Sequence, residues 1–436
     1  MFAPVTVRRS LSRAARAHAP DDAQARGDHV PVLHGLRGVA ILLVFVNHAI
    51  AGPLRPSTLP MDVAVRTVAY TGWVGVDLFF ILSGFLITGI LLDTQGRPGW
   101  WPNFIARRAL RIFPLYYGAL AVLFVILPWL VRWSNADFVT LQANQRWYWT
   151  YTVNLLVALT HGRGTPLYTT HFWSLSIEEQ FYLIWPLILW ACRPQTLLRV
   201  AALLVIAGLA FRLGLVLHDP FNARAAYTLT PGRLDGLMTG AALAVVARLP
   251  GGLARLKAVA PQVLGAGAFA LCALAMSRGG LDALDPVVAV VAYPILALVF
   301  GSLLVLALTT PPTGRLVRTL SSPSLGAWGK YSYAIYLVHY PLLGAIEWKT
   351  TFYQREVALL GGSRLPSVLL LAALTMSLSY VLGWLSYHLY EKRFLELKRY
   401  FPLQRSLPRP SAAPDVTTQQ REAEHARGSR GLARAS

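Results

Sequence analysis

The chain has 436 residues, of which 55% are hydrophobic and 14% are charged. A soluble domain carries about 25% charged residues, so this composition excludes an ordinary water-soluble fold and predicts an integral membrane protein. The formal net charge of +20 does not indicate nucleic-acid binding, because many basic residues lie in two polar terminal segments and in short loops. Basic residues in such places hold helix ends at an anionic membrane surface. We therefore expect membrane lipids as partners, and no nucleic acid.

Long apolar runs recur along the whole chain, several of them near the ~20 residues that a helix needs to cross a bilayer. Helices satisfy their own backbone hydrogen bonds in lipid, so these runs predict an all-α transmembrane bundle. The ten predicted spans are 33–50, 73–92, 112–131, 173–191, 197–217, 234–247, 259–276, 287–309, 328–346 and 367–390. The run 234–247 is short for a span. The brief aromatic stretch 147–159 is interpreted as interfacial or re-entrant, since Trp and Tyr favour the headgroup level.

Charge patterning predicts how the bundle is oriented. An even number of spans places both termini on one side, and assigning them to the cytoplasm gives the cytoplasmic loops the higher density of Lys and Arg. We therefore expect a multi-pass protein of the cell inner membrane with both termini cytoplasmic. Residues 1–32 and 395–436 are basic and lack hydrophobic periodicity, so we predict a disordered arm and a disordered tail around a transmembrane domain at 33–394.

The first span carries two ionisable residues, Arg37 and His48, which are eleven positions apart. On a helix this separation is a rise of about 16 Å with a residual rotation of roughly 20°, so both side chains lie nearly on one face. Arg37 is expected near the inner boundary and His48 deeper, towards the outer half. Ionisable residues inside a span are functional candidates because burying them in lipid is costly. The alternatives are an interface anchor for Arg37 and a hydrogen-bonded interhelical histidine for His48.

The second span contains small residues and one carboxylate. Gly75, Ser83, Gly84 and Gly89 allow a helix or a thin ligand to approach closely, and for the glycines close helix packing is the favoured interpretation. Asp77 needs a partner, and an Arg or His on a neighbouring helix would serve.

Three arginines, Arg107, Arg108 and Arg111, cluster at the predicted cytoplasmic mouth of the third span. Arg108 and Arg111 are three positions apart and share a helical face. Guanidinium groups match phosphate oxygens in geometry and charge. Anchoring at the membrane surface explains one such residue but not a paired face, so the pair predicts phosphate binding.

The fourth span begins with polar residues in an otherwise apolar run. Ser174 or Ser176 could cap the helix, with Glu178 or Glu179 satisfying amide groups of the first turn. That interpretation accounts for one glutamate and leaves the second as a functional candidate. The two cysteines of the chain match no disulfide framework and no metal-ligand spacing, and no metal is expected.

Taken together, these segments resemble the bacterial membrane acyltransferase-3 family from about Pro31 to Phe394. Five motifs occur in register: Arg-x10-His at Arg37 and His48; Gly-x-Asp-x-Phe-Phe-x-Leu-Ser-Gly-Phe at Gly75–Phe85; Arg-x-x-Arg at Arg108 and Arg111; Trp-Ser-Leu-x-x-Glu-x-Gln-Phe-Tyr at Trp173–Tyr182; and Ser-Tyr-x-x-Tyr-Leu-x-His-x-Pro at Ser332–Pro341. The last motif places His339 within the ninth span.

The resemblance implies an O-acyltransferase, an enzyme that transfers groups other than amino-acyl groups. Members of the family O-acetylate lipopolysaccharide, exopolysaccharide and other glycans, and some acylate macrolides. The expected donor is acyl-CoA, with acetyl-CoA preferred, and the expected acceptor is a glycan, a glycolipid or another glycosylated molecule. Some members carry an additional esterase-like domain, and because only about 40 residues follow the tenth span, we expect none in this chain.

The hypothesised roles follow the motifs. Arg108 and Arg111 would hold the phosphates of the donor, with Arg37 adding positive charge. His48 would act as general base, and Glu178 would orient either the imidazole or the acceptor. A covalent acyl-histidine relay is a less favoured variant. The competing class is a transporter or flippase of a lipid-linked glycan, which intramembrane Arg and His would also fit.

Overall fold

The structure is a computed structural model that describes residues 30–55, 57–130, 136–350 and 362–403. The predicted arm 1–32 lies outside the described residues except for its last three, and most of the predicted tail also lies outside them. The first residues of that tail, 395–403, continue directly from the last long helix.

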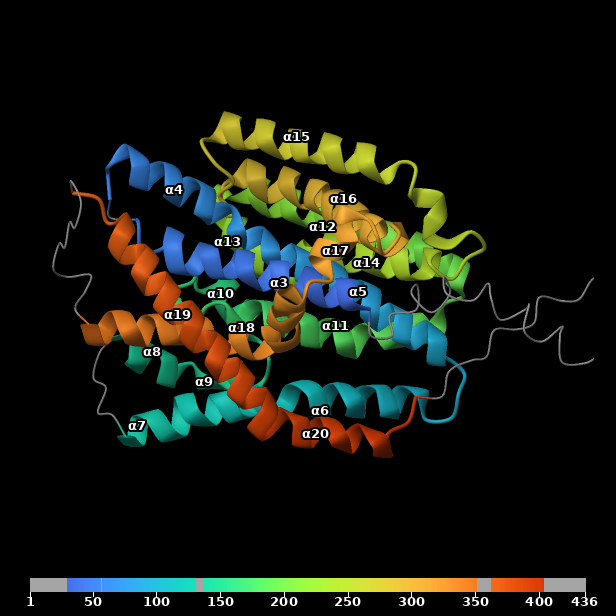
Figure 1. The fold of residues 1–436 in the computed structure, drawn as a ribbon, viewed down its shortest axis with the longest axis horizontal. Helices are drawn as coiled ribbons and strands as arrows, with labels where there is room; N and C mark the ends of the chain where they lie inside the picture. The colour runs from blue at the N-terminus through green and yellow to red at the C-terminus, as the bar shows by residue number, and fades with distance from the viewer. Residues whose placement is uncertain (1–29, 56, 131–135, 351–361, 404–436) are drawn as a thin grey trace, which may run out of the picture.

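Long helices dominate the described chain, and each predicted span overlaps one of them (Figure 1). They are α3 (Pro31–Val46), α5 (Gly75–Thr94), α6 (Trp100–Ala121), α11 (Phe172–Ala191), α12 (Pro194–His218), α14 (Leu234–Val246), α15 (Ala260–Arg278), α16 (Pro286–Thr309), α18 (Pro323–Thr350) and α19 (Leu365–Ser386). Several begin with proline, whose fixed φ and missing amide suit a first turn. Asp285 caps α16 by accepting the amides of Val287 and Val288.

Seven continuous helices in the described part of the chain are long and apolar enough to cross a membrane. The spans predicted on α11, α14 and α18 are not among them. Helix α14 has 13 residues, and α11 carries the polar run around Glu178 and Glu179. The multi-pass character is therefore supported, while the count of ten spans and the cytoplasmic location of the termini stay predictions.

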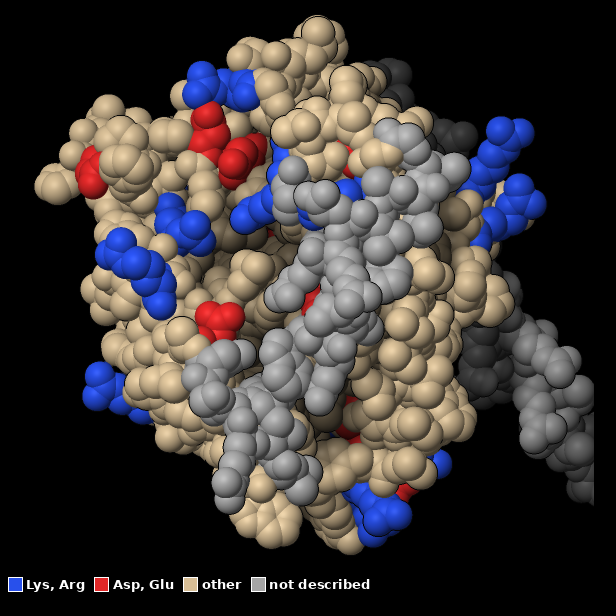
Figure 2. Space-filling model, turned by 90° about the vertical axis from the view of Figure 1, so that its left-hand side faces the viewer, with Lys and Arg blue, Asp and Glu red and all other residues tan. Residues whose placement is uncertain are grey.

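The two ends of the bundle differ in what they carry. The α5–α6 connection and α20 (Lys392–Glu396) lie at one end, whereas α4 (Pro60–Tyr70) begins and α7 (Leu127–Leu130) ends at the other (Figure 1). Figure 2 views the molecule from the α4 and α7 end, where the visible Lys and Arg form separate groups among uncharged residues and a few Asp and Glu. A dispersed arrangement of this kind is what loops at a membrane surface require, rather than a continuous basic groove for a polyanion.

Close helix packing explains the glycines of the second span. A Cβ added at Gly84 would lie 2.0 Å from the carbonyl oxygen of Leu237 on α14, and one at Gly240 would lie 2.1 Å from that of Ile81 on α5. Gly75 meets the carbonyl oxygen of Ala40 on α3 in the same way, at 2.4 Å. The packing interpretation is therefore confirmed for Gly75 and Gly84, and it places α3, α5 and α14 backbone against backbone.

Asp77 does have the cationic partner that its burial demands. Its Oδ1 accepts a hydrogen bond from Arg233 at 2.7 Å, in the turn η6 (Thr230–Arg233) that precedes α14. Arg233 is buried, and its guanidinium lies 4.1 Å from the ring centroid of Tyr293. A second buried pair, Arg212 with Asp235, joins α12 to α14. These two buried ion pairs thus connect α5, α12 and α14 inside the bundle.

The aromatic stretch 147–159 forms two short helices, α9 (Gln145–Trp149) and α10 (Val153–Leu159). Tyr151 between them has φ of 53°, a left-handed conformation that is uncommon for a residue with a side chain. Tyr148 and Tyr151 are buried, and Tyr151 stacks on Tyr116 with ring centroids 4.0 Å apart. These two tyrosines therefore pack inside the protein and shape its core, and the interpretation of the stretch as interfacial or re-entrant stays a prediction.

Candidate active site

A cavity of about 870 Å³, counted with its open mouth, lies among α3, α5, α6, α11 and α18. Its polar lining consists of Arg37, Arg108 and Arg111, the carboxylates of Glu178 and Glu179, and the hydroxyl groups of Ser83, Tyr151, Ser174, Tyr182, Ser332, Tyr333 and Tyr336. Convergence of polar groups from five helices, charged ones from three of them, marks this cavity as the candidate site.

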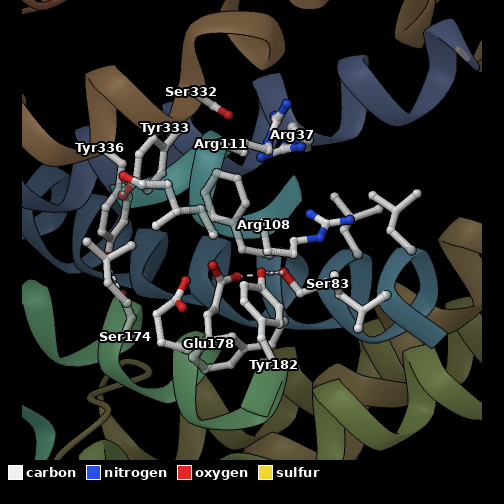
Figure 3. A pocket seen from close by; sticks show the side chains of 18 of the residues that line it. Arg37, Ser83, Arg108, Arg111, Ser174, Glu178, Tyr182, Ser332, Tyr333 and Tyr336 are labelled. Atoms are coloured by element: carbon white, nitrogen blue, oxygen red, sulfur yellow. Dashed lines mark hydrogen bonds between the residues drawn. The ribbon is translucent and has the colours of Figure 1, made fainter. Parts of the chain in front are cut away.

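Three arginines from two helices meet in this cavity. Arg108 and Arg111 project from α6, and Figure 3 shows Arg111 beside Arg37 of α3. The described residues provide none of the three with a carboxylate within 4.0 Å. Glu178 and Glu179 attract Arg37 and Arg108 only from a longer distance. An anion bound between the arginines would therefore lower the remaining repulsion among them. The three arginines are therefore a candidate anion-binding cluster, and the phosphate binding predicted for Arg108 and Arg111 stays a prediction.

Glu178 faces the arginines from α11. Its Oε1 accepts a hydrogen bond from Ser83 Oγ at 2.6 Å, and the Tyr182 hydroxyl lies 3.2 Å from the same Ser83 oxygen. The capping interpretation for this segment is wrong, because α11 begins at Phe172 and no side chain caps it. Ser174 and Ser176 lie within the helix and bond to its own carbonyl oxygens. Glu178 is consequently a cavity residue on the second turn.

His48 belongs to a separate cluster of rings beyond the cavity. It lies in η1 (Asn47–Ala51), a π-helical turn that continues α3, and such turns are frequent at functional sites. Its Nδ1 is 2.9 Å from Nε2 of His339 on α18, and its ring stacks on Tyr340 with centroids 4.0 Å apart. His171 lies edge-on to both histidines, with centroids 6.2 Å and 5.3 Å away.

The backbone around His339 indicates where the protons of this histidine pair reside. Nδ1 of His339 is 3.0 Å from the Ile335 carbonyl oxygen and 2.8 Å from that of Tyr336. Carbonyl oxygens only accept, so Nδ1 carries the hydrogen and Nε2 of the neutral ring is an acceptor. Nδ1 of His48 must then donate to it. This assignment leaves the lone pair of His48 on Nε2, where a general base needs it.

Tyr336 connects the cavity with the histidine cluster. It lines the cavity at the side opposite Arg37 and Arg111, next to Ser174 (Figure 3). Its hydroxyl lies 2.5 Å from Ser174 Oγ and donates to the His171 carbonyl oxygen at 3.2 Å, and its ring centroid is 5.7 Å from that of His339. The cavity thus has an arginine side and a side that adjoins the histidines.

The structure therefore brings together Arg37, Arg108, Arg111 and Glu178 in one cavity, and it places His48 in the neighbouring cluster of rings. Among the described hydrogen bonds of Glu178 none reaches His48, so the imidazole is oriented by His339 instead. Sequence reasoning assigned no role to His171, His339 or Tyr336. The signal for the last two was present in the motif Ser332–Pro341, which carries both residues on one helix.

A helical membrane bundle with an arginine-lined cavity beside a buried histidine pair fits a membrane-embedded group-transfer enzyme. The chain belongs to the acyltransferase-3 family, whose model, described as an acyltransferase domain, matches residues 30–384. The resemblance drawn from the five motifs is thereby confirmed.

Curated relatives of this chain are named as O-acetyltransferases. The chain is 29% identical over 336 residues to the peptidoglycan O-acetyltransferase OatA of Listeria monocytogenes, covering 72% of this chain and 49% of that protein. It is 28% identical over 333 residues to the putative peptidoglycan O-acetyltransferase YrhL of Bacillus subtilis, with the same two shares. It is 27% identical over 332 residues to the O-acetyltransferase OatA of Staphylococcus aureus, covering 72% of this chain and 51% of that protein.

The chain spans about half the length of these curated relatives. No solved structure matches it.

Proposed function

We propose that this protein is a membrane O-acyltransferase that moves an acetyl group from acetyl-CoA to a hydroxyl of a glycan or another glycosylated acceptor. One observation carries the proposal: three arginines that form no ion pair with the described carboxylates line one cavity, and the His48–His339 pair lies just beyond it, on the far side of Tyr336. Acyl-CoA fits this arrangement, because its phosphates, which would bind the arginines, lie at one end and its thioester, which would react near the histidine, lies at the other.

The donor is proposed to enter at the arginine side. Arg108 and Arg111 bind its phosphates through charge-assisted hydrogen bonds, and Arg37 adds a third positive charge. The pantetheine arm then extends along the cavity towards Tyr336. The rise of about 16 Å from Arg37 to His48 along one helix suits the length of such an arm.

The transfer step needs one base and one acid. Nε2 of His48 removes the proton of the acceptor hydroxyl as its oxygen attacks the thioester carbonyl carbon. The carbon–sulfur bond breaks, and the CoA thiolate leaves and takes up that proton from the imidazolium. His339 keeps the tautomer of His48 correct throughout. Glu178 is proposed to position the acceptor or the donor, since its carboxylate faces the cavity.

The acceptor is proposed to be a saccharide. The names of the relatives from Listeria and Bacillus state peptidoglycan as their substrate, which supports a glycan acceptor for the matched portion of this chain. We further propose that the protein resides in the cell inner membrane and that the arginine side faces the cytoplasm, where acyl-CoA is found.

A direct test uses the purified full-length protein and acetyl-CoA labelled in the acetyl group. We expect loss of the thioester that depends on the protein and that rises when a saccharide acceptor is added. A transporter or flippase of a lipid-linked glycan would leave the labelled acetyl-CoA intact, and that result would remove the proposal.

Replacing Arg108 and Arg111 together by alanine is expected to raise the KM for acetyl-CoA at least about tenfold, because each charge-assisted hydrogen bond contributes about 1.5–3 kcal/mol. Steady-state kinetics at varied acetyl-CoA will measure this change. Arg111→Lys should recover only part of the affinity, since a lysine offers no bidentate fork. Arg315→Ala, at the exposed start of α17 (Arg315–Leu320), is the matched control. An unchanged KM in the double variant would contradict phosphate binding by this pair.

A further inference from the structure

The segment that follows α19 lies along the beginning of α6. It comprises α20, η9 (Leu397–Tyr400) and the residues up to Leu403, and it lies beyond the part of the chain that the family model matches. Figure 1 shows α20 beside α6 at the arginine end of the bundle. Its position is set by backbone contacts. Arg107 donates to the carbonyl oxygens of Lys398 at 2.9 Å and Phe401 at 3.2 Å, and Asn103 donates to that of Pro402 at 2.8 Å.

This arrangement adds a fourth and a fifth cation to the mouth of the cavity. The Lys398 ammonium is partly buried and interacts electrostatically with Arg111, Arg108 and Arg107, and all three interactions are repulsive. No carboxylate forms an ion pair with Lys398 within the part of the chain that the structure describes. The backbone contacts of Arg107 hold Lys398 near this group of arginines, and a further anion bound there would reduce the repulsion between them.

The order of groups along CoA indicates which charge that is. The thioester lies at one end, the pyrophosphate follows the pantetheine arm, and the 3′-phosphate of the adenosine lies farthest from the thioester. Arg37, Arg108 and Arg111 line the cavity, whereas Arg107 and Lys398 lie outside its lining, on the side where α6 begins. A donor whose thioester points inward would therefore present its 3′-phosphate to the outer pair.

We propose that Lys398, with Arg107, forms a subsite for the 3′-phosphate of the donor and makes the protein selective for CoA over 3′-dephospho-CoA. The subsite rests on the proposed acyl-CoA function and adds a specificity-determining element from outside the family match. Lys398 contacts Arg107 through its backbone carbonyl, so a side-chain substitution leaves that hydrogen bond in place.

The test compares acetyl-CoA with acetyl-3′-dephospho-CoA on the full-length protein in nanodiscs. Wild type is expected to show a KM about tenfold or more higher for the dephospho donor, as loss of one charge-assisted contact predicts. Lys398→Gln should raise the KM for acetyl-CoA to the dephospho value and leave the dephospho KM unchanged. Arg399→Gln, an exposed neighbour on η9, is the matched control and should behave as wild type.

Three results would overturn the subsite. Wild type that uses both donors equally well rejects selectivity while leaving the acyltransferase function intact. An equal rise in KM for both donors in Lys398→Gln, varying with the anionic-lipid content of the nanodiscs, assigns Lys398 to lipid headgroups. Absence of binding of either CoA form by calorimetry removes both the subsite and the proposed function.

Discussion

His48→Ala is expected to reduce acetyl transfer by at least about 100-fold while leaving the affinity for CoA near that of wild type. A positioned general base contributes about 10²–10⁴ in rate, and alanine removes the only nitrogen that the histidine pair leaves free to accept a proton from the substrate. Binding should persist because the arginines proposed to bind the phosphates line the cavity, whereas His48 lies beyond it. Transfer of labelled acetyl and calorimetric CoA binding measure the two effects separately.

Variants of His339 test the tautomer argument behind this result. His339→Gln keeps an acceptor for Nδ1 of His48 and should retain part of the activity, whereas His339→Leu removes the acceptor and should lower kcat without a matching change in the KM for acetyl-CoA. His218→Ala, at the exposed end of α12, is the control for histidine loss in general. Near-normal activity of His48→Ala would reject His48 as the base.

Hydropathy predicted the helices well because a lipid-facing helix must be apolar over its whole length. It was least informative for helices in the interior. α11 combines Glu178 and Glu179 with apolar residues, and its polar run faces the cavity rather than lipid. Short aromatic stretches were ambiguous for a related reason. Tyr148 and Tyr151 could equally serve a membrane interface or a core, and only their packing against Tyr116 decides between the two.

The spacing of Arg37 and His48 predicts a common face of one regular helix, whereas the structure places Arg37 in the cavity lining and His48 beyond it. The π-helical turn at Asn47–Ala51 alters the local rotation and could not be read from residue types. Contacts between segments far apart in the sequence also could not be predicted from local patterns. The partner of His48 is 291 positions away along the chain, and no local pattern relates their positions. Asp77 was different, because a buried carboxylate demands a cation and Arg233 supplies it.

Asp77→Ala is expected to destabilise the whole bundle, with a cost of about 3–5 kcal/mol for leaving a buried charge without its partner. Arg233 is buried among aromatic rings and would keep no carboxylate from the described residues in its place. The predicted readout is a thermal midpoint lowered by several degrees in detergent, with a reduced yield of monodisperse protein. Arg278→Ala, which breaks the exposed pair with Asp285, should change the midpoint little.

The double variant Asp77→Leu and Arg233→Met separates stability from function at this pair. Replacing a buried ion pair by apolar side chains of similar volume is often neutral, so the double variant should regain much of the midpoint that Asp77→Ala loses. Arg233 also lies over the ring of Trp173, on the same helix as Glu178. If the double variant is stable and active, the pair serves packing alone. If it is stable but its kcat falls, the pair also positions α11 for the reaction. If the double variant has a midpoint as low as that of Asp77→Ala, the loss of stability does not come from an unpaired charge.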